Sequence, residues 1–418
     1  MLRGSVWAIR DLRIALVART VSAAGSSVTS VTALLLIHAS GLGPYGVAGL
    51  LGCLFVPVIA TMGIAGRVAD GADSRTVLVV ATLVQTVGCT AVALVPEPAV
   101  IYPAVAVVAL AQAFAQPTWS ALVPRIVGED RIGHAVAWQQ GLNSVSGPIG
   151  YAVGGLLVGL GLARWGFGVD ALSYLLLAIA AICVGTRRRA LAVRQGERRR
   201  WTEGLTIAGH DPIVRPLFAT ILVFVILVEG INSVEVFLVR DTLHATSFQY
   251  GLSEFFSGAG ALAGAAIAGR VRGIRGRSLV ACAGFGTAAL GLVAAAIAPD
   301  FWLYALTLIL LSGGFGVGNA TFGALLVSRT PDAARGTVYA ALGGLSNTAK
   351  VIALAVGSSS LIFVAPRVSF LIAGTAGVLV MIIAGGALRA PLKQIGSVPE
   401  SLHRWAASAR QPESFPDT

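Results

Sequence analysis

The residues of this sequence best suited to chemistry are four ionisable side chains that stand within otherwise apolar stretches. Glu229 and Glu235 share one such stretch, Glu254 lies in the next, and Lys350 lies in a later one. A charge near the centre of a lipid bilayer costs several kcal/mol, so a residue kept there usually faces a cavity or a charged partner. We therefore take these four residues as candidates for binding and releasing a proton inside a membrane.

Glu229 and Lys350 are expected to lie at the same depth. With a rise of about 1.5 Å per residue, each is roughly 20 Å along its helix, so the two side chains could pair. Burial disfavours an ionised carboxylate and a neighbouring lysine favours it, so a proton and Lys350 could compete for Glu229. A static ion pair between two helices is the alternative. Glu235 lies nearer the outer interface, and Glu254, roughly 9 Å inside it, is expected to be a gate or a side chain that reaches the surface.

Polar side chains inside other apolar stretches are candidates for contact with a substrate. Gln112 and Gln116 share one helix face, and Trp119 lies close by. Asn232 shares a helix face with the first of the two glutamates, and Asn319 ends a glycine-rich run. Such residues could line a cavity for an amphipathic molecule. Hydrogen bonds between packed helices are the alternative.

Two further charges are given structural roles, and no enzyme site emerges. Arg19 is expected to extend to the membrane interface as an anchor, and Asp170 to stabilise a helix end. The 5 histidines and 4 cysteines show neither metal-ligand nor catalytic-triad spacing. No phosphate-binding glycine loop with a lysine occurs. The sequence therefore predicts no metal, no cofactor and no enzymatic activity.

The composition indicates that this chain lies in a lipid bilayer. Hydrophobic residues make up 56% of it, charged residues only 12%, and the mean hydropathy is +0.82. A water-soluble domain could not bury so much apolar surface. The net charge of +11 comes from arginines that punctuate apolar stretches instead of forming one patch, so nucleic acid is excluded as a partner.

Twelve stretches are long and apolar enough to cross a membrane, which takes about 20 residues. With both chain termini in the cytoplasm, Arg164, Arg240 and Arg367 are the only basic residues outside, and the positive-inside rule favours this orientation. We expect the inner membrane of a bacterium. The stretches start near Leu12, Pro44, Thr76, Ala99, Ile132, Trp165, Pro216, Phe248, Ser278, Phe301, Thr337 and Val368.

The chain repeats itself at an offset of 203 residues. Gly66-Arg-Val recurs as Gly269-Arg-Val, and further matches at the same offset follow in three later segments. Two halves with the same orientation require an even number of spans each, and six plus six is the natural solution. We expect an N-terminal six-helix bundle over residues 1–185, a basic cytoplasmic linker over 186–215, a C-terminal bundle over 216–390 and a cytoplasmic tail over 391–418.

Several motifs resemble those of the major facilitator superfamily. The stretch 66–75, GRVADGADSR, resembles the signature loop of that superfamily, with Gly71 and Ser74 at two positions that are usually basic. Gly147-Pro148 resembles part of the antiporter motif of proton-coupled exporters. Three further stretches resemble the drug-exporting branch called transmembrane secretion effectors: Gln116 to Pro124, Val169 to Tyr174, and Gly204 to Pro216.

The resemblance implies roles for these motifs. Gly66, Asp70 and Arg75 would form a conformational latch between the halves, with Gly66 allowing two helix ends to approach closely; plain anchoring of helix ends is the alternative. Gly147 and Pro148 would shape a kinked helix at the interface between halves, with ordinary close packing as the alternative. The seventh helix lines the central cavity in this superfamily, so Glu229 in the seventh span resembles a proton or cation site.

The sequence as a whole predicts an all-α membrane protein with twelve transmembrane helices in two pseudo-symmetric six-helix bundles, the major facilitator fold. We expect a monomeric, proton-coupled exporter of hydrophobic or amphipathic small molecules, with protons and membrane lipids as its other partners. Uptake of a metabolite or siderophore by the same fold is the first alternative. A non-transporting membrane sensor and a membrane-embedded enzyme are alternatives of another class.

Overall fold

The protein is built from long helices. The computed structural model describes residues 7, 9–128, 131–186, 201–330, 332–361 and 363–393, and no strand occurs among them. A short helix, α7 (Trp201–His210), precedes the second half, and a π-helical turn, η3 (Leu238–Thr242), extends α8. The long helices are α1 (Arg10–Ala39), α2 (Gly43–Gly71), α3 (Ser74–Leu94), α4 (Pro98–Val127), α5 (Ile132–Gly159), α6 (Ala163–Cys183), α8 (Val214–Phe237), α9 (Ser247–Ala268), α10 (Ile274–Ile297), α11 (Phe301–Arg329), α12 (Asp332–Ser360) and α13 (Pro366–Lys393).

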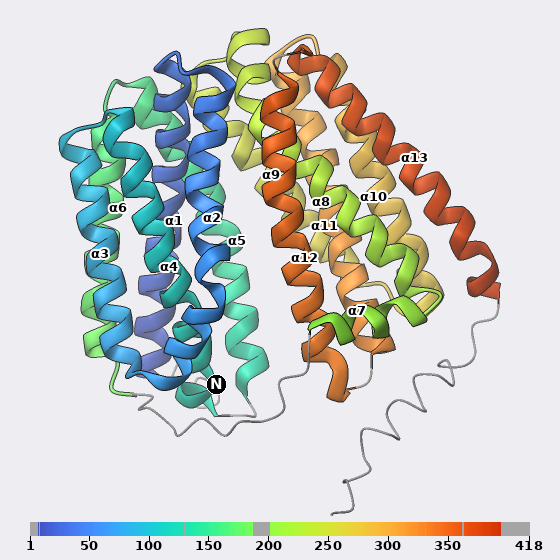
Figure 1. The fold of residues 1–418 in the computed structure, drawn as a ribbon, viewed down its shortest axis with the longest axis horizontal. Coiled ribbons are helices and arrows are strands. Elements are labelled where there is room, and N and C mark those ends of the chain that lie inside the picture. Colours follow the sequence, from blue (N-terminus) through green and yellow to red (C-terminus); the bar gives the residue numbers. More distant parts are fainter. Residues whose placement is uncertain are drawn as a thin grey trace, which may run out of the picture.

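These helices form two bundles that stand side by side, α1 to α6 in one and α8 to α13 in the other (Figure 1). The start of α1, the helix α7 and the end of α13 lie at the same end of the molecule, at the bottom of Figure 1. We call this the linker end and the opposite one the far end. Each bundle therefore begins and finishes at the linker end, as an even number of spans requires.

The helix bounds confirm the internal repeat. The helices α4 and α11 start at Pro98 and Phe301, and α6 and α13 start at Ala163 and Pro366; each pair is separated by the offset of 203 residues that the sequence predicted. The composite of α8 and η3, which ends at Thr242, corresponds to α1, which ends at Ala39. The two halves thus have the same helix order and the same direction, which confirms the predicted fold class of two pseudo-symmetric six-helix bundles.

By length and composition, 10 of the described helices are apolar enough to cross a membrane. The two remaining long helices, α5 and α12, have 28 and 29 residues and are long enough, but they carry more polar side chains. They are equivalent in the repeat, and each packs against a helix of the opposite bundle, α5 against α9 and α12 against α2. Their polarity follows from this position, because a helix at the interface of the halves borders the space between them as well as lipid.

Helix ends are set by local signals. Asp73 accepts hydrogen bonds from the backbone N–H groups of Arg75 and Thr76 at the start of α3, at 2.9 and 3.2 Å. Asp300 does the same for the start of α11, and Thr246 forms a capping box at the start of α9. Such caps satisfy N–H groups that the first turn of a helix leaves free.

Small residues bring the helices into backbone contact within each bundle. A Cβ on Gly150 of α5 would collide with the Ala24 carbonyl of α1, and a Cβ on Gly284 of α10 would lie 2.6 Å from the backbone nitrogen of Gly318 in α11. In a membrane, where lipid competes for apolar contacts, such close approach is a main source of helix association.

The linker joins the second bundle through a buried ion pair. Asp211, between α7 and α8, accepts from the backbone N–H groups of Ile213 and Val214 and forms a 2.8 Å ion pair with Arg329 at the end of α11. The second half of the predicted linker is therefore packed against the bundle. The run of linker arginines up to residue 200 and the tail beyond residue 393 lie outside the described residues.

Candidate transport site

A cavity of about 760 Å³ lies between the two bundles. It extends from Tyr250 and Tyr304, near the far end, to Ala265, near the linker end of α9. Most of its lining side chains are aliphatic or aromatic, with a few polar groups among them. The polar lining residues are Ser30, Asn143, Ser144, Tyr151, Asn232, Glu235, Tyr250, Glu254, Ser257, Tyr304 and Ser312.

The two halves are in contact toward the far end. A Cβ on Gly155 of α5 would lie 2.5 Å from the carbonyl oxygen of Ser247, and a Cβ on Gly251 of α9 would lie 2.5 Å from that of Tyr151. His38, at the end of α1, also lies 3.0 Å from the carboxylate of Asp241 in η3. These contacts close the space between the bundles at that end.

The linker end is open by comparison. Figure 1 shows the linker ends of α5 and α12 standing apart. Among the described residues, no atom outside the glycine's own helix backbone lies within 4 Å of the position that a Cβ would take on the glycines in this part of α2, α5 and α12, namely Gly63, Gly66, Gly133, Gly141 and Gly344. The cavity is therefore reached from the linker end in this conformation.

The proline of the antiporter-like motif lies at the interface of the halves. Pro148 lines the cavity, and a Cβ on Gly258 of α9 would collide with its ring. Gly147 faces α1 instead, with the hydroxyl of Ser27 3.7 Å from its would-be Cβ. This placement suits the interface position that the resemblance implied, while the functional role of Gly147 and Pro148 remains a prediction.

Glu235 is a buried acid in the cavity wall. One of its carboxylate oxygens, Oε1, accepts a hydrogen bond from the Tyr304 hydroxyl at 2.8 Å and one from the Ser253 hydroxyl at 3.4 Å. These partners come from α11 and α9, so three helices hold this carboxyl. No lysine, arginine or histidine among the described residues forms an ion pair with it.

Glu254 stands next in sequence to Ser253 and also lines the cavity. Its carboxyl interacts electrostatically with that of Glu235, and both act on the neighbouring Tyr250. Within the described part of the chain, Glu254 has neither a hydrogen bond nor an ion pair. The structure thus brings two acids together in one wall without a cation, whereas the sequence suggested a gate or a surface-reaching side chain for Glu254.

Glu229 and Lys350 form the ion pair that their equal depth suggested, with 2.7 Å between Nζ and Oε1. The helices α8 and α12 approach closely here, because a Cβ on Gly357 would collide with the carbonyl of Gly230. Asn232 donates to the same carboxylate at 3.2 Å, and the Lys350 ammonium lies 5.6 Å from the centre of the Phe55 ring. Phe55 and Asn232 line the cavity, whereas Glu229 and Lys350 are not among its lining residues.

The predicted substrate-contact residues divide into three groups. Asn232 lines the central cavity, and Gln112 lines a smaller chamber in the N-terminal half, where it accepts from Gln85 at 2.9 Å. Gln116, Trp119 and Asn319 line none of the described cavities. Trp119 is buried in the N-terminal bundle, and Asn319 is exposed on α11. The three residues expected on one cavity face are thus divided: Gln112 lines the chamber, whereas Gln116 and Trp119 both contact Arg19.

Arg19 is not a surface anchor. Its guanidinium donates to Gln116 at 3.1 Å and lies 5.7 Å from the centre of the Trp119 ring. The side-chain amide of Gln139 in α5, with its oxygen toward Arg19, accepts from the same guanidinium at 3.0 Å. The side chain turns into the bundle because amide oxygens on α4 and α5 offer it acceptors.

The hydrogen bonds described for the signature loop lie within the N-terminal bundle. Arg75 donates to the carbonyl of Val184 at 2.7 Å, which joins α3 to the end of α6 within one bundle. The close approach expected at Gly66 is not seen among the described residues, since none of their atoms outside the backbone of α2 lies within 4 Å of its would-be Cβ. The side chain of Asp70 lies outside the described residues, so its latch role stays a prediction.

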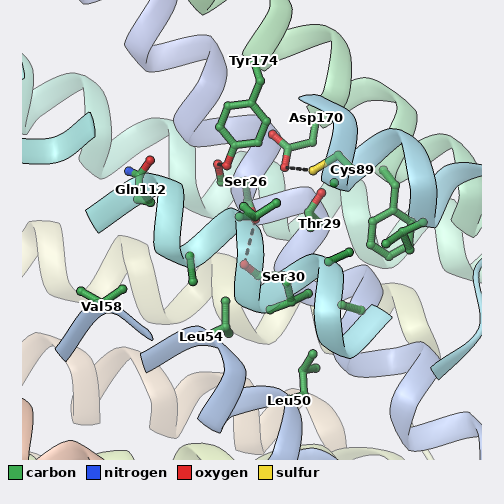
Figure 2. A pocket seen from close by; sticks show the side chains of 18 residues that line it. Ser26, Thr29, Ser30, Leu50, Leu54, Val58, Cys89, Gln112, Asp170 and Tyr174 are labelled. Atoms are coloured by element: carbon green, nitrogen blue, oxygen red, sulfur yellow. Dashed lines mark hydrogen bonds between the residues drawn. The ribbon is translucent and has the colours of Figure 1, made fainter. Parts of the chain in front are cut away.

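A second cavity of about 190 Å³ lies inside the N-terminal bundle, and the sequence did not indicate it. Figure 2 shows the carboxyl of Asp170 on its wall, beside Thr29 and Cys89. Asp170 is fully buried; its Oδ1 accepts from the Ser173 hydroxyl at 3.0 Å and its Oδ2 lies 3.6 Å from the Cys89 sulfur. Asp170 therefore does not stabilise a helix end, since it lies well inside α6 and its carboxyl meets side chains.

The comparison with protein families decides what kind of protein this arrangement belongs to. A family model described as transmembrane secretion effector matches residues 6–410, nearly the whole chain. The chain belongs to the transmembrane secretion effector family of the major facilitator superfamily. It is thus a multi-pass membrane transporter and not an enzyme, as the sequence predicted. No curated protein matches this secretion effector by sequence.

Solved transporters share the fold of this secretion effector. A POT peptide transporter bound to alafosfalin has a TM-score of 0.70 at 14% identity, covering 94% of this chain and 96% of its own. The nucleoside transporter NupG has a TM-score of 0.67 at 12% identity, covering 91% of this chain and 99% of its own. A bacterial homologue of the human lysosomal transporter Spinster, in an inward-facing conformation, has a TM-score of 0.66 at 14% identity, covering 90% of this chain and 95% of its own. At 12–14% identity these likenesses establish the fold.

Proposed function

We propose that this transmembrane secretion effector is a proton-coupled exporter of hydrophobic or amphipathic small molecules. It works by alternating access, in which the two bundles rock about the central cavity and open it to one side of the membrane at a time. The far-end contacts are broken and the linker end closes when the cavity changes sides. We also propose that the protein acts as a monomer, because each chain contains both halves of the cavity.

The observation that carries the proton coupling is the pair formed by Glu235 and Glu254. Both carboxyls line the cavity, and no described cation neutralises either of them. Two like charges close together in a medium of low dielectric cannot both be ionised at small cost. A proton bound by this pair, and exchanged when the cavity changes sides, supplies the coupling. Glu229 is neutralised by Lys350 and is the second candidate, through competition between the proton and the lysine.

The proposed direction of transport, export, follows the description of the family as secretion effectors, and the charge distribution sets which end faces the cytoplasm. The predicted orientation places the linker end, both termini and most arginines in the cytoplasm of a bacterium and the far end outside its inner membrane. The cavity with its apolar lining then opens toward the cytoplasm, where an exporter collects its substrate. Leu262, Leu308 and Phe315 supply such lining, which discriminates among substrates by size and shape more than by hydrogen bonding.

The test is transport by the full chain in proteoliposomes, with ethidium as the amphipathic probe and a proton gradient of defined direction. Right-side-out and inverted populations are separated by labelling at the far end. We expect ethidium to move toward the far-end side against its own gradient, with protons moving the opposite way. Accumulation on the linker-end side would instead establish uptake. An absence of any proton-dependent flux, with this probe and a panel of uncharged dyes, would contradict the proposal and favour a non-transporting sensor.

A further inference from the structure

The chamber in the N-terminal bundle adjoins the central cavity. Ser30, Leu50 and Leu54 line both spaces, so the wall between α1 and α2 separates them by one layer of side chains. The chamber lies on the cavity side of Asp170 and Tyr174, with the polar groups of Ser26, Thr29 and Cys89 around it (Figure 2). A group bound in the central cavity could therefore extend into it.

The chamber has one strongly polar wall. The Asp170 carboxyl has a thiol and a hydroxyl as neighbours, and no basic side chain of the described residues lines the space. The opposite wall is apolar, with Leu50, Leu54 and Val58 from α2. A buried carboxylate is costly without a cation, so a positively charged group that enters the chamber is stabilised there.

The position of Asp170 is fixed by its surroundings. Gly25 of α1 lies directly against it, since a Cβ on this glycine would be 2.6 Å from the Asp170 carboxylate oxygen Oδ1 and 2.6 Å from the Ser173 hydroxyl. The Tyr174 hydroxyl is held by Ser26 at 2.9 Å. The acid is therefore ordered beside the chamber before any ligand enters, which lowers the entropic cost of binding.

The acid of the chamber has no counterpart at the equivalent position of the other half. At the repeat offset of 203 residues, Ala373 corresponds to Asp170, Leu292 to Cys89 and Phe315 to Gln112, and all three lie in or pack against the core of the C-terminal bundle. The chamber residues of α1 keep polar counterparts, since Ser26, Thr29 and Ser30 correspond to Glu229, Asn232 and Ser233. The fold therefore does not require a carboxyl at the position of Asp170.

We infer that the chamber is a subsite for the cationic amine end of an amphipathic substrate, with Asp170 as the group that recognises the charge. A cavity of about 150 Å³ can hold benzene, so a space of about 190 Å³ suits a ring-sized amine. The inference rests on the proposed function, since it names the substrate class of the same exporter. It places the apolar body of the molecule in the central cavity and its amine between α1, α3 and α6.

The test measures binding directly and uses Cys89 as a reporter beside Asp170. In the full chain with Cys53→Ala, Cys183→Ala and Cys282→Ala, in lipid nanodiscs, the rate of Cys89 modification by methyl methanethiosulfonate is recorded against the concentration of benzylamine or benzyl alcohol. Each rate is divided by the rate without probe. We expect benzylamine to protect Cys89 with an apparent affinity about tenfold higher than benzyl alcohol, the size expected for a hydrogen bond to a charged group.

Three variants interpret the result. Asp170→Asn keeps the shape and removes the charge, so the preference for the amine should disappear. Asp300→Asn is the matched control, because asparagine also caps a helix, and it should keep the preference. Gln112→Phe introduces the residue of the other half, fills the chamber with Asp170 in place and should reduce protection by both probes. The Gln112→Phe variant therefore tests the inference even if Asp170→Asn does not fold.

Equal protection by the two probes, or an amine preference that persists in Asp170→Asn, would overturn the inference and leave Asp170 as part of a structural polar cluster. These outcomes do not depend on transport. Amine-selective protection without proton-driven flux would support the subsite and contradict the proposed function. Proton-driven flux without selective protection would support the proposed function and contradict the subsite.

Discussion

The acidic side chains within the membrane helices have three different surroundings. Glu229 is paired with a lysine, Glu235 is held by a tyrosine and a serine, and Asp170 lies beside a thiol and a hydroxyl. The cost of a buried carboxylate depends on its partner, so the three should respond differently when the charge is removed. An amide substitution retains size and hydrogen bonding but cannot titrate, which makes it the appropriate probe at each position.

The first prediction concerns the Glu229–Lys350 pair. Lys350→Ala leaves a partly buried carboxylate without its cation and should lower the free energy of unfolding by about 1–3 kcal/mol. The double variant Glu229→Gln with Lys350→Met removes both charges and should recover most of that loss. Thermal unfolding of the wild type, Lys350→Ala and the double variant in one detergent gives the comparison.

Transport by the same double variant separates the two roles of this pair. If the pair is a static link between α8 and α12, the double variant keeps proton-driven transport. Loss of uphill transport with normal stability would show that competition between the proton and Lys350 drives coupling, and that Glu229 and not the cavity pair is the proton site.

At the residue scale, the sequence predicted how deep a charged side chain lies in the membrane but not which side chains it contacts. The equal depth of Glu229 and Lys350 follows from counting residues along two helices, and the structure places the two side chains in contact. The partners of Glu235 come from α9 and α11, and those of Asp170 from α3 and α6, so they depend on which helices are adjacent and how each is rotated. Hydropathy carries no information on rotation, which is why Arg19 and Trp119 were assigned to the wrong surroundings.

At the scale of the helices, close approach between bundles depends on glycines of α5 and α9. Gly155 and Gly251 meet backbone atoms of the opposite helix, so the far-end contact has no room for a methyl group. Helix bounds themselves were predictable, because caps and apolar length are local features. The close contact between α5 and α9 was not predictable, since glycines in this alanine- and glycine-rich chain are found both at interfaces and facing open space.

The second prediction follows from this contact. Gly155→Ala should weaken far-end closure by about 1–3 kcal/mol, the usual cost of overpacking, and so reduce the ratio of closed to open molecules at this end roughly five- to 150-fold. Spin labels at Tyr45→Cys and Phe363→Cys, both exposed near the far end in opposite halves, report the opening as a longer distance between the labels.

Gly168→Ala is the control for this measurement, because no atom lies within 4 Å of its would-be Cβ. It should leave the distance distribution unchanged. An unchanged distribution in Gly155→Ala as well would mean that the α5–α9 contact does not hold the far end closed.

At the scale of the whole molecule, the repeat explains where the far end is closed. His38 and Asp241 are separated by the repeat offset of 203 residues, and they touch each other. Equivalent residues of two halves related by a two-fold axis can meet only near that axis. The pair therefore lies where the two halves meet at the far end, and an exchange between conformations that opens this end must separate it.

The third prediction uses this pair. In a chain whose native cysteines are replaced by alanine, the variant His38→Cys with Asp241→Cys should form a disulfide on mild oxidation and lose transport. Reduction should restore it, and each single cysteine variant should remain active after oxidation. Full transport by the completely cross-linked protein would mean that the far end need not open during the cycle.

The central claim is that the two acids in the cavity wall carry the coupled proton. The most direct measurement is uphill ethidium transport in proteoliposomes by Glu235→Gln, Glu254→Gln and the double variant, with proton flux followed in parallel by a trapped pH dye. We expect the double variant to lose uphill transport and substrate-driven proton movement while it still exchanges ethidium down its gradient, because the cavity is intact and only titration is lost. Uphill transport by the double variant at the wild-type rate would contradict the claim.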